Sequence, residues 1–468
     1  MQYKITIKRN GRLYITPTPQ NIVSVTLDKT LYYEKQDKHY MTNPRYGEIH
    51  LYSKKTGSTS IGFLYKVIKI LRQHADKITV TDERIIKCHI GLENQTLSYN
   101  LYPFQQEAVS KYVNNPLKMG VLSIPTRGGK TYITMDIITK INLRTLILVT
   151  NVGLAEQWVN TLSKEFSSDE IGHIFKGKKK LRNITVAVDK SAWKYRDFLG
   201  NFNFIIVDEC HHLSGSILRK VVNRCNNGIY KLGLSATPET QKDDQIRIES
   251  MVGNIIYKVE RKELIKDEFI VNATVYYVKM LPRPDLMFSQ YNDVYEEYIV
   301  NNHERNTKVI NIANKSKGLV IVLINRIEHG ELLYNMFIKN IDKHNNSKKL
   351  DKDRVMFVHG KTPDRFEIFQ NAIDGKYDIL ISTKILNEGI TLPNAITVIL
   401  AGAGKSFIET TQKVGRILGT YKGKKMSYIY DFGDKCKYFD EQSDERRHIL
   451  TQDFESIDID VDLTSSQP

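Results

Sequence analysis

Residues 205–212 read IIVDECHH, an apolar run that ends in two adjacent carboxylates, Asp208 and Glu209. Upstream of it, the apolar run at 120–124 is followed by the turn PTRGGKT at 125–131. Strands of a parallel sheet that is covered on both faces are continuously apolar, and their carboxyl ends meet at one edge. The two segments therefore predict neighbouring strands that bring a lysine and two carboxylates together.

These residue types suit the binding and cleavage of a nucleoside triphosphate. Lys130 would place a positive charge between the β- and γ-phosphates, and the Thr131 hydroxyl would hold Mg²⁺. Asp208 would reach the same metal ion through water, while Glu209 would orient and deprotonate the attacking water. The helix N-terminus behind the loop also favours phosphate. Three further loop residues are expected at the nucleotide: Thr126, Gly128 and Gly129.

Each half of this pattern also has an ordinary explanation. A glycine-lysine-threonine turn is frequent by chance, and a carboxylate pair can simply mark where a strand meets solvent. The loop departs from the usual phosphate-binding pattern, because Ile124 stands where glycine or alanine is usual and Arg127 where a third glycine is common. The two segments in this order, each after a buried type of strand, favour a nucleotide hydrolase.

The composition excludes several other classes of protein. With 468 residues the chain can hold two or three domains, and 41% hydrophobic residues is ordinary for a globular protein. Its apolar runs are far shorter than the roughly 20 residues of a membrane span, and the N-terminus lacks the apolar core of a signal peptide. The 4 cysteines have no CxxC spacing, which fits a reducing compartment. Consecutive Cys210, His211 and His212 cannot all face one ion, so no metal cluster is expected there.

The charge is strongly basic and unevenly distributed. Lys and Arg number 68 against 53 Asp and Glu, a net charge of +15 that favours a polyanionic partner. Residues 1–100 hold sixteen basic and eight acidic residues, more than half of the excess. Residues 451–468 contain five acidic residues and no basic one, and are expected to form a solvated, disordered tail.

The pattern of apolar segments predicts three folded sections. Residues 1–98 alternate at 3–8, 22–27 and 48–52 and contain a helical pattern near 61–74, which indicates a small, basic α+β accessory domain. Residues 99–262 and 263–450 each alternate buried strands with helices. The expected strands are 120–124, 145–150, 184–188, 204–208 and 231–235, then 273–279, 319–324, 355–358, 379–382, 396–401 and 427–431. The predicted fold class is α/β, with two tandem RecA-like parallel-sheet lobes.

A series of short motifs accompanies these strands in a fixed order. LYPFQ at 101–105 precedes the phosphate loop, TNVGLAEQW at 150–158 follows the next strand, and SATP at 235–238 follows the carboxylate strand. STKILNEGITLP at 382–393 and QKVGR at 412–416 come later. Across roughly residues 100–435 the series resembles the superfamily 2 helicases and translocases. Within them it looks most like the UvsW-type branch-migrating recombination helicases of tailed bacteriophages.

The resemblance implies roles for further residues, although loop and helix-capping chemistry would explain each one as well. Gln105 would read the adenine edge, since an amide offers both a donor and an acceptor. Ser235 and Thr237 would couple hydrolysis to the nucleic-acid track, and Gly389 would line the nucleotide or the strand. The residues expected along the nucleic-acid backbone are Asn151, Gly153, Gln157, His359, Lys361 and Thr383. The segment 359–362, which follows the expected strand 355–358, is expected to contact phosphates at a helix N-terminus.

Two residues four apart, Gln412 and Arg416, would share one face of a helix over 407–418. The resemblance makes Arg416 the arginine finger that stabilises charge on the transferring phosphoryl group. The usual second arginine of this motif is replaced by Gly419, so Arg416 acts alone or another basic residue, such as Lys413 or Lys422, substitutes. The segments AGAGKS at 401–406 and DFG at 431–433 imitate a phosphate loop and a kinase motif, and are interpreted as a turn and a strand end.

The resemblance implies an ATP- and Mg²⁺-dependent DNA helicase or translocase that remodels branched DNA in recombination, repair or replication. An RNA helicase would share these motifs. An ATP-gated DNA-binding scaffold with weak hydrolysis would fit the unusual loop and Gly419. The basic first domain would either grip duplex DNA or pack as a lid on the first lobe. A cytoplasmic location is expected, that of the host if the chain is phage-encoded.

Overall fold

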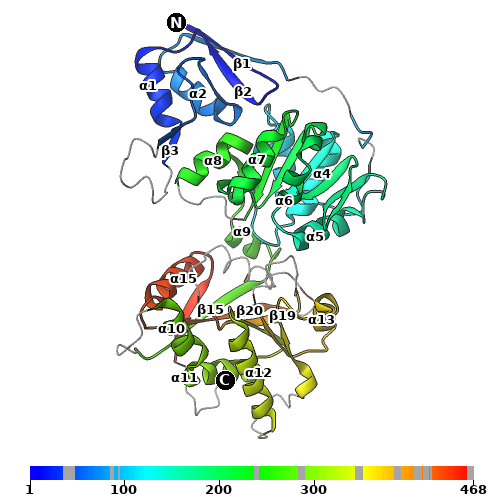
Figure 1. The fold of residues 1–468 in the computed structure, drawn as a ribbon, viewed down its shortest axis with the longest axis vertical. Helices are drawn as coiled ribbons and strands as arrows, with labels where there is room; N and C mark the ends of the chain where they lie inside the picture. Colours follow the sequence, from blue (N-terminus) through cyan, green and yellow to red (C-terminus); the bar gives the residue numbers. More distant parts are fainter. Residues whose placement is uncertain are drawn as a thin grey trace. The chain divides into compact units, whose positions relative to one another are not determined.

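The computed structural model describes residues 1–34, 48–84, 89–92, 95–236, 242–282, 290–342, 351–383, 392–403, 414, 421 and 424–460. The chain divides into two compact units between Val259 and Glu260, with loop residues 126–128 grouped with the second unit. The first unit holds the N-terminal domain and lobe 1, and the second holds lobe 2 (Figure 1). Within the described residues no helix is long and apolar enough to cross a membrane.

The N-terminal domain is a four-stranded sheet with two helices. The sheet order is β5 (Ser58–Ser60), β2 (Arg12–Thr16), β1 (Gln2–Ile7) and β6 (Lys77–Asp82), and the helices are α1 (Asn21–Thr30) and α2 (Leu64–Leu71). A two-stranded sheet pairs β3 (Tyr32–Glu34) with β4 (Glu48–His50).

The predicted strand at 22–27 is wrong, because this segment lies inside helix α1. The apolar residues that decide its fold are Val23 and Leu27, which are buried four apart on one helical face. Val25, which completes the apparent alternation with Val23 and Leu27, is 45% exposed.

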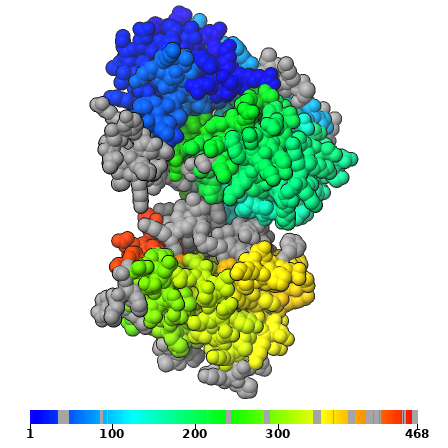
Figure 2. Space-filling model, in the orientation of Figure 1, coloured from blue at the N-terminus to red at the C-terminus, as the bar shows by residue number. Residues whose placement is uncertain are grey.

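The N-terminal domain shares a hydrophobic core with lobe 1. Its apolar residues pack in one cluster with Leu117, Met119 and Ile246 of lobe 1. At α8 (Lys242–Val252) the two backbones approach so closely that a Cβ on Gly62 would lie 1.9 Å from the carbonyl oxygen of Glu249. Figure 2 shows the blue and green surfaces of this unit directly adjoining on the face in view. The domain is therefore docked on lobe 1 rather than tethered to it.

Lobe 1 contains an eight-stranded sheet whose central strands are parallel and almost entirely buried. The order is β10 (Lys178–Lys180), β9 (Ile171–Phe175), β11 (Ile184–Val188), β8 (Thr145–Val149), β12 (Phe204–Asp208), β13 (Tyr230–Ser235), β7 (Met119–Ser123) and β14 (Ile255–Lys258). Only the edge pairing of β10 with β9 is antiparallel. The helices of the lobe are α3 (Pro103–Val113), α4 (Lys130–Ile141), α5 (Val152–Leu162), α6 (Asp189–Lys194) and α7 (Ser216–Arg224), with α8.

Lobe 2 contains a seven-stranded sheet in which every described pairing is parallel. The order is β17 (Val355–Val358), β18 (Ile379–Ser382), β16 (Leu319–Leu323), β19 (Ala395–Leu400), β20 (Met426–Gly433), β15 (Asn272–Lys279) and β21 (Glu455–Ile459). The helices are α9 (Arg261–Lys266), α10 (Tyr291–Tyr295), α11 (His303–Lys315), α12 (Ile327–Asp342), α13 (Arg365–Ile373) and α15 (Phe439–Asp453).

The two sheets match the α/β class and the strand positions predicted from the apolar runs. The expected disordered tail is wrong for residues 455–459, which form β21 at the edge of the sheet beside β15. Its acidic side chains are accommodated because the edge faces solvent and because Asp458 forms an ion pair with Arg447 at 2.7 Å.

Candidate nucleotide and nucleic-acid site

Four adjacent strands of lobe 1 carry the motifs predicted from the sequence. They are parallel, and their order is β8, β12, β13, β7. Their carboxyl ends are followed by residues 150–158, by Glu209, by Ala236 and by the loop 124–129. The prediction that the phosphate-loop strand and the carboxylate strand are neighbours is wrong, because β13 lies between β7 and β12. Because the carboxyl ends of parallel strands meet at one edge, segments more than a hundred residues apart in the chain converge there.

The phosphate loop ends in a left-handed glycine that starts helix α4. Gly129 is the N-cap, with φ 82° and ψ 30°, and Lys130 is the first helical residue. The positive φ favours glycine at this position, and Gln105 Nε2 lies close enough that a Cβ at Gly129 would be 2.3 Å from it. Arg127, which replaces the third glycine, also has a positive φ of 74°. The loop therefore keeps a glycine-type path despite the substitution.

Lys130 and Glu209 approach each other at the base of this loop. Lys130 Nζ lies 3.7 Å from Glu209 Oε1 and 3.4 Å from the carbonyl oxygen of Ile124. Glu209 has a left-handed backbone, with φ 50° and ψ 54°, directly after strand β12. The structure thus brings together the predicted phosphate lysine and the predicted general base.

Asp208 is a buried carboxylate held by two N–H donors. The Trp158 indole Nε1 donates to Oδ2 at 2.8 Å, and the backbone N of Glu209 donates to Oδ1 at 3.0 Å. Burial raises the pKa of Asp208, with a further contribution from Glu209, while Lys130 and Trp158 oppose the rise. A carboxylate whose ionised form is costly gains from a nearby cation, which suits the predicted metal role.

His211 links the carboxylate segment to strand β13. Its Nδ1 lies 3.1 Å from Ser235 Oγ and 3.4 Å from Glu209 Oε2, and the side chain is 2% exposed. Burial lowers the pKa of His211 to about 4, so the ring is neutral at pH 7. The predicted coupling residue Ser235 therefore contacts the hydrolysis segment through His211, whereas Thr237 lies outside the described residues.

The predicted nucleic-acid residues of lobe 1 lie at the start of α5. Asn151 is its N-cap, and Asn151 Oδ1 accepts a hydrogen bond from the backbone N of Leu154 at 2.9 Å. This is the helix-capping role that was the alternative interpretation of Asn151. Gly153 lies in the first turn, and Gln157 is exposed one turn further on.

In lobe 2 the structure describes three of the predicted site residues. His359 and Thr383 follow the neighbouring strands β17 and β18, and the backbone N of Thr383 donates to Val358 O at 3.3 Å. The segment 359–362 was expected at a helix N-terminus, which is wrong. It forms a turn in which Thr362 Oγ1 accepts from the backbone N of His359 at 2.9 Å, and α13 begins only at Arg365. Lys361 is exposed on this turn.

Several predicted residues fall outside the described part of the chain. They are Gly389, Gln412, Arg416 and Gly419, together with the helix expected over 407–418 except for Val414.

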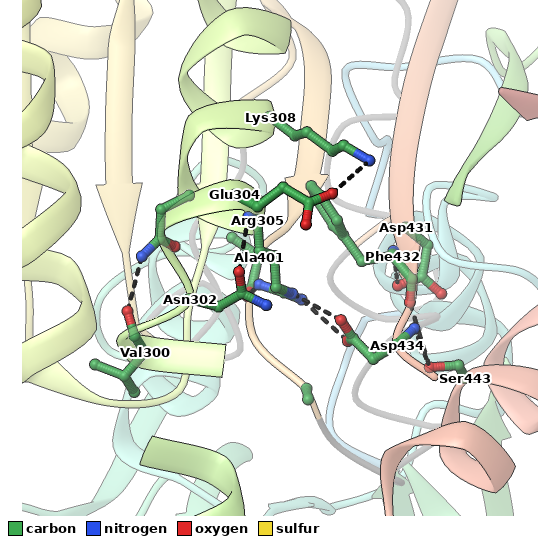
Figure 3. A network of polar contacts seen from close by, with 12 residues as sticks. Val300, Asn302, Glu304, Arg305, Lys308, Ala401, Asp431, Phe432, Asp434 and Ser443 are labelled. Carbon is green, nitrogen blue, oxygen red and sulfur yellow. Dashed lines mark hydrogen bonds and ion pairs between the residues drawn. The ribbon is translucent and has the colours of Figure 1, made fainter. Parts of the chain in front are cut away.

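Lobe 2 instead reveals a buried polar network at the ends of β19 and β20 (Figure 3). Arg305 is fully buried, and its Nε and Nη2 bind Asp434 at 2.8 and 3.2 Å. Its Nη1 donates to the carbonyl oxygen of Ala401, and its guanidinium lies 4.4 Å from the Phe432 ring centroid. The turn at 401–403, which resembled a phosphate loop, is anchored by this contact.

A second buried pair lies beside the first. Arg446 Nε on α15 binds both oxygens of Asp431, at 3.1 and 2.9 Å, at the end of β20. The DFG segment at 431–433 is a strand end, as the sequence predicted. The structure adds that Arg446 neutralises its aspartate.

Trp158 and Arg305 were not identified from the sequence as site or network residues. For Trp158 the available signal was its position beside Gln157 in the motif at 150–158, which placed it near the edge but did not reveal its partner. Arg305 had no signal, because an arginine in the helical pattern of 303–315 is most often solvated.

Two family models match this chain, one in each lobe. The family of type III restriction enzyme res subunits matches residues 98–240, and the helicase conserved C-terminal domain matches residues 294–418. The DNA 3'-5' translocase XPB2 of Sulfurisphaera tokodaii is 26% identical over 348 residues, 68% of this chain and 78% of that protein. The ATP-dependent DNA helicase uvsW of Enterobacteria phage T4 is 24% identical over 379 residues, 76% of this chain and 72% of that protein.

Solved structures support the same fold. The ATP-dependent Type ISP restriction-modification enzyme LlaBIII, bound to DNA, matches 86% of this chain with 34% of its own length, at a TM-score of 0.59 and 14% identity. The match to type III restriction res subunits, followed by the match to the helicase C-terminal domain, supports a superfamily 2 helicase. The chain is an ATP-dependent helicase that resembles UvsW, as predicted from its motifs.

Proposed function

We propose that this chain is an ATP-driven DNA motor that remodels branched DNA, by branch migration or unwinding, in recombination, repair or replication. The observation that carries the proposal is the approach of Lys130 to Glu209, beside buried Asp208, where the central strands of lobe 1 end. The DNA helicases and translocases to which the chain is similar support DNA as the polymer.

The residues of lobe 1 fit ATP with Mg²⁺. The left-handed Gly129 and the first turn of α4 offer backbone N–H groups to phosphate, and Lys130 adds a point charge. Thr131 and Asp208 are hard oxygen donors of the kind that Mg²⁺ takes through one or two protein ligands and water. When bound, Mg²⁺ would neutralise charge on the β- and γ-phosphates.

The chain's own groups then divide the work of hydrolysis. Glu209 orients the attacking water and accepts its proton, and Lys130, which now lies 3.7 Å from Glu209, binds the phosphates. The neutral His211 ring connects Glu209 with Ser235, so that a change at the carboxylate reaches strand β13. Gln105 would contact adenine, and Arg416 would stabilise charge on the transferring phosphoryl group.

The nucleic-acid strand would lie along loops that follow the strands of each lobe. Asn151, Gly153 and Gln157 would contribute from lobe 1, and His359, Lys361 and Thr383 from lobe 2. Contacts through amides, hydroxyls and a lysine read the backbone rather than the bases, so movement would be largely independent of sequence.

The N-terminal domain has a basic sheet face suited to duplex DNA. Tyr3, Ile5 and Ile7 point into its core, which places Lys4 on the opposite face of β1. Cα pairing puts Lys77 of β6 opposite Gln2, on that same face, and both lysines are exposed. Since this domain is docked on lobe 1, the DNA-gripping role and the packing role both remain compatible with its structure.

The central experiment measures ATP hydrolysis and strand separation on forks, four-way junctions, tailed duplexes and RNA hybrids. We expect turnover to be stimulated by DNA and branched DNA to be processed best, with Glu209→Gln as the inactive control. Stimulation by RNA alone would indicate an RNA helicase. Nucleotide-dependent DNA affinity without any hydrolysis would indicate the ATP-gated scaffold.

The role of the N-terminal face is tested by the double variant Lys4→Glu, Lys77→Glu. Deletion of the domain is a poorer test, because it would uncover Leu117, Met119 and Ile246. We expect weaker binding to forked DNA and a salt slope that is shallower by about 0.7 to 0.9 per lost phosphate contact. The matched control is Lys339→Glu with Lys376→Glu, which changes charge equally on lobe 2. Equal losses in both double variants would favour the packing role.

Arg416 is tested by the variant Arg416→Ala. It should lose DNA-stimulated hydrolysis and still bind nucleotide. Wild-type turnover in this variant would show that another residue is the arginine finger.

A further inference from the structure

The indole N–H of Trp158 donates a hydrogen bond to the carboxylate of Asp208. Trp158 lies on α5, is 3% exposed, and donates through Nε1 to Asp208 Oδ2 at 2.8 Å. A buried indole N–H needs a hydrogen-bond partner, and a backbone carbonyl would be sufficient. Its partner here is the carboxylate proposed to serve Mg²⁺, which comes from a different strand fifty residues later in the chain.

The two donors to Asp208 together fix the plane of its carboxylate. Trp158 holds Oδ2, and the backbone N of Glu209 holds Oδ1 at 3.0 Å. Each carboxylate oxygen accepts in two directions, so one donor per oxygen leaves acceptor capacity on both. The carboxylate is oriented without being saturated.

An indole also orients a carboxylate without supplying charge. Arginine at this place would neutralise Asp208, as Arg446 does for Asp431, and would compete with a metal cation. Neutral outer groups that orient metal ligands are typically worth about 10- to 100-fold in metal affinity.

The same helix carries the predicted nucleic-acid residues on other faces. Asn151 is the N-cap of α5, and Gln157 is exposed, whereas Trp158 is buried with Ala155 and Leu162. Adjacent residues on a helix point about 100° apart, so Gln157 and Trp158 face different surroundings on one rigid element.

We propose that Trp158 is the positioning residue for the metal carboxylate: its indole holds Asp208 in the orientation that serves Mg²⁺ and connects helix α5 to the metal side of the site. This inference rests on the proposed function, because it requires that Asp208 serve Mg²⁺ with a bound nucleotide.

The first test uses calorimetry of Mg²⁺ binding to the full chain in the presence of saturating ADP. Trp158→Phe keeps an aromatic ring in the core and removes the donor. We expect its Mg²⁺ dissociation constant to rise about 10-fold or more. The matched control is Trp193→Phe, which alters the half-buried tryptophan that lies 5.6 Å from Arg196, and should leave the constant unchanged.

The second test leaves Trp158 intact. The chain has 2 tryptophans, so Trp193→Phe makes Trp158 the sole indole reporter. We expect addition of Mg²⁺ with ADP to change its emission intensity or maximum, and the same addition to Asp208→Asn in that background to change nothing. This measurement holds even if Trp158→Phe does not fold.

The outcomes separate the inference from the proposed function. Two results would overturn the role of Trp158 alone. One is a wild-type Mg²⁺ affinity in Trp158→Phe. The other is a Trp158 emission that does not change on addition of Mg²⁺ with ADP, although calorimetry shows that Mg²⁺ binds. If the wild-type chain binds no Mg²⁺ with ADP at all, the nucleotide site itself is wrong.

Discussion

The carboxyl ends of β12 in lobe 1 and β20 in lobe 2 each carry buried aspartates, and the two lobes treat them differently. Asp431 and Asp434 of lobe 2 are bound by Arg446 and Arg305 at 2.8 to 3.2 Å. Asp208 of lobe 1 is instead bound by an indole and a backbone amide, which carry no charge.

The difference shows how one kind of sheet edge serves two purposes. A buried carboxylate that is matched by arginine is a structural group, since its charge is already satisfied and no ligand would gain by approaching it. A buried carboxylate that is held only by neutral donors keeps an unbalanced negative charge, which a bound cation can neutralise. The chemistry at a strand end therefore depends on the charge of the partner more than on the aspartate itself.

The largest effect should follow a change to the lobe 1 edge. Glu209→Gln removes the proton acceptor but keeps the side-chain size, so we expect ATP turnover to fall about 10²- to 10⁴-fold. The measurement is DNA-stimulated phosphate release, with the thermal midpoint recorded as a check on folding. Turnover within threefold of wild type would contradict the assignment of Glu209.

Breaking the lobe 2 pair should lower stability rather than chemistry. Arg305→Met leaves Asp434 buried with an unmatched charge, and we expect about 3 to 5 kcal/mol less free energy of unfolding for this lobe. Chemical denaturation followed by circular dichroism measures it. The double variant Arg305→Met, Asp434→Leu should recover much of the loss, and failure to recover would show that the loss comes from packing around Phe432 instead.

A smaller effect should appear on acidification, through a buried histidine of lobe 2. Burial, with Arg305 nearby, lowers the pKa of His329 to about 3, and its Nε2 lies 2.9 Å from Asn306 Oδ1. The unfolded chain binds a proton near pH 6.5 and the folded chain does not, so stability falls as pH drops from about 6.5 toward 3. We expect a loss of about 2 kcal/mol between pH 7 and 5.

The share of His329 in this loss is isolated by His329→Gln, whose side-chain amide can still donate to Asn306. Its unfolding free energy should change less with pH than that of the wild type. Parallel pH curves for the two proteins would contradict a neutral, buried His329.

The smallest effect is expected at an exposed pair near the same strand end. Lys435 and Asp440 are joined at 2.5 Å, yet 43% and 50% of their side-chain surfaces are exposed. Because solvent screens such pairs, Asp440→Asn should change the free energy of unfolding by less than about 1 kcal/mol. A loss as large as that of Arg305→Met would mean that burial does not govern the difference between these ion pairs.

The sequence predicted both sheets because parallel strands that are buried on both faces consist of continuous apolar residues, as at 204–208 and 319–323. Strands β9 and β14 were not predicted. In β9 a glycine and a histidine interrupt the apolar run, and in β14 the run is short and ends in a lysine. The strand β21 was not predicted: Ile457 and Ile459 alternate with acidic residues as in a strand, but the acidic composition of the segment is also typical of a solvated tail.

The sequence predicted which loops form the candidate site, but only some of the contacts between their side chains. Lys130 and Glu209 were expected to meet, since their strands carry chemistry to a shared edge. The pairing of Trp158 with Asp208 depends on how α5 is rotated on the sheet, and the pairing of Arg305 with Asp434 spans 129 residues. Neither rotation nor long-range pairing is encoded in local periodicity.

Strand β21 has a consequence for the behaviour of the protein in solution. It is the outermost strand of its sheet, with Glu455, Asp458 and neighbouring positions exposed to water. An unpaired edge strand can form backbone hydrogen bonds with a strand of another chain, and negative charge on that edge strand repels a second copy of this chain. Replacing these carboxylates with neutral residues should therefore promote self-association of the protein while leaving ATP hydrolysis unchanged.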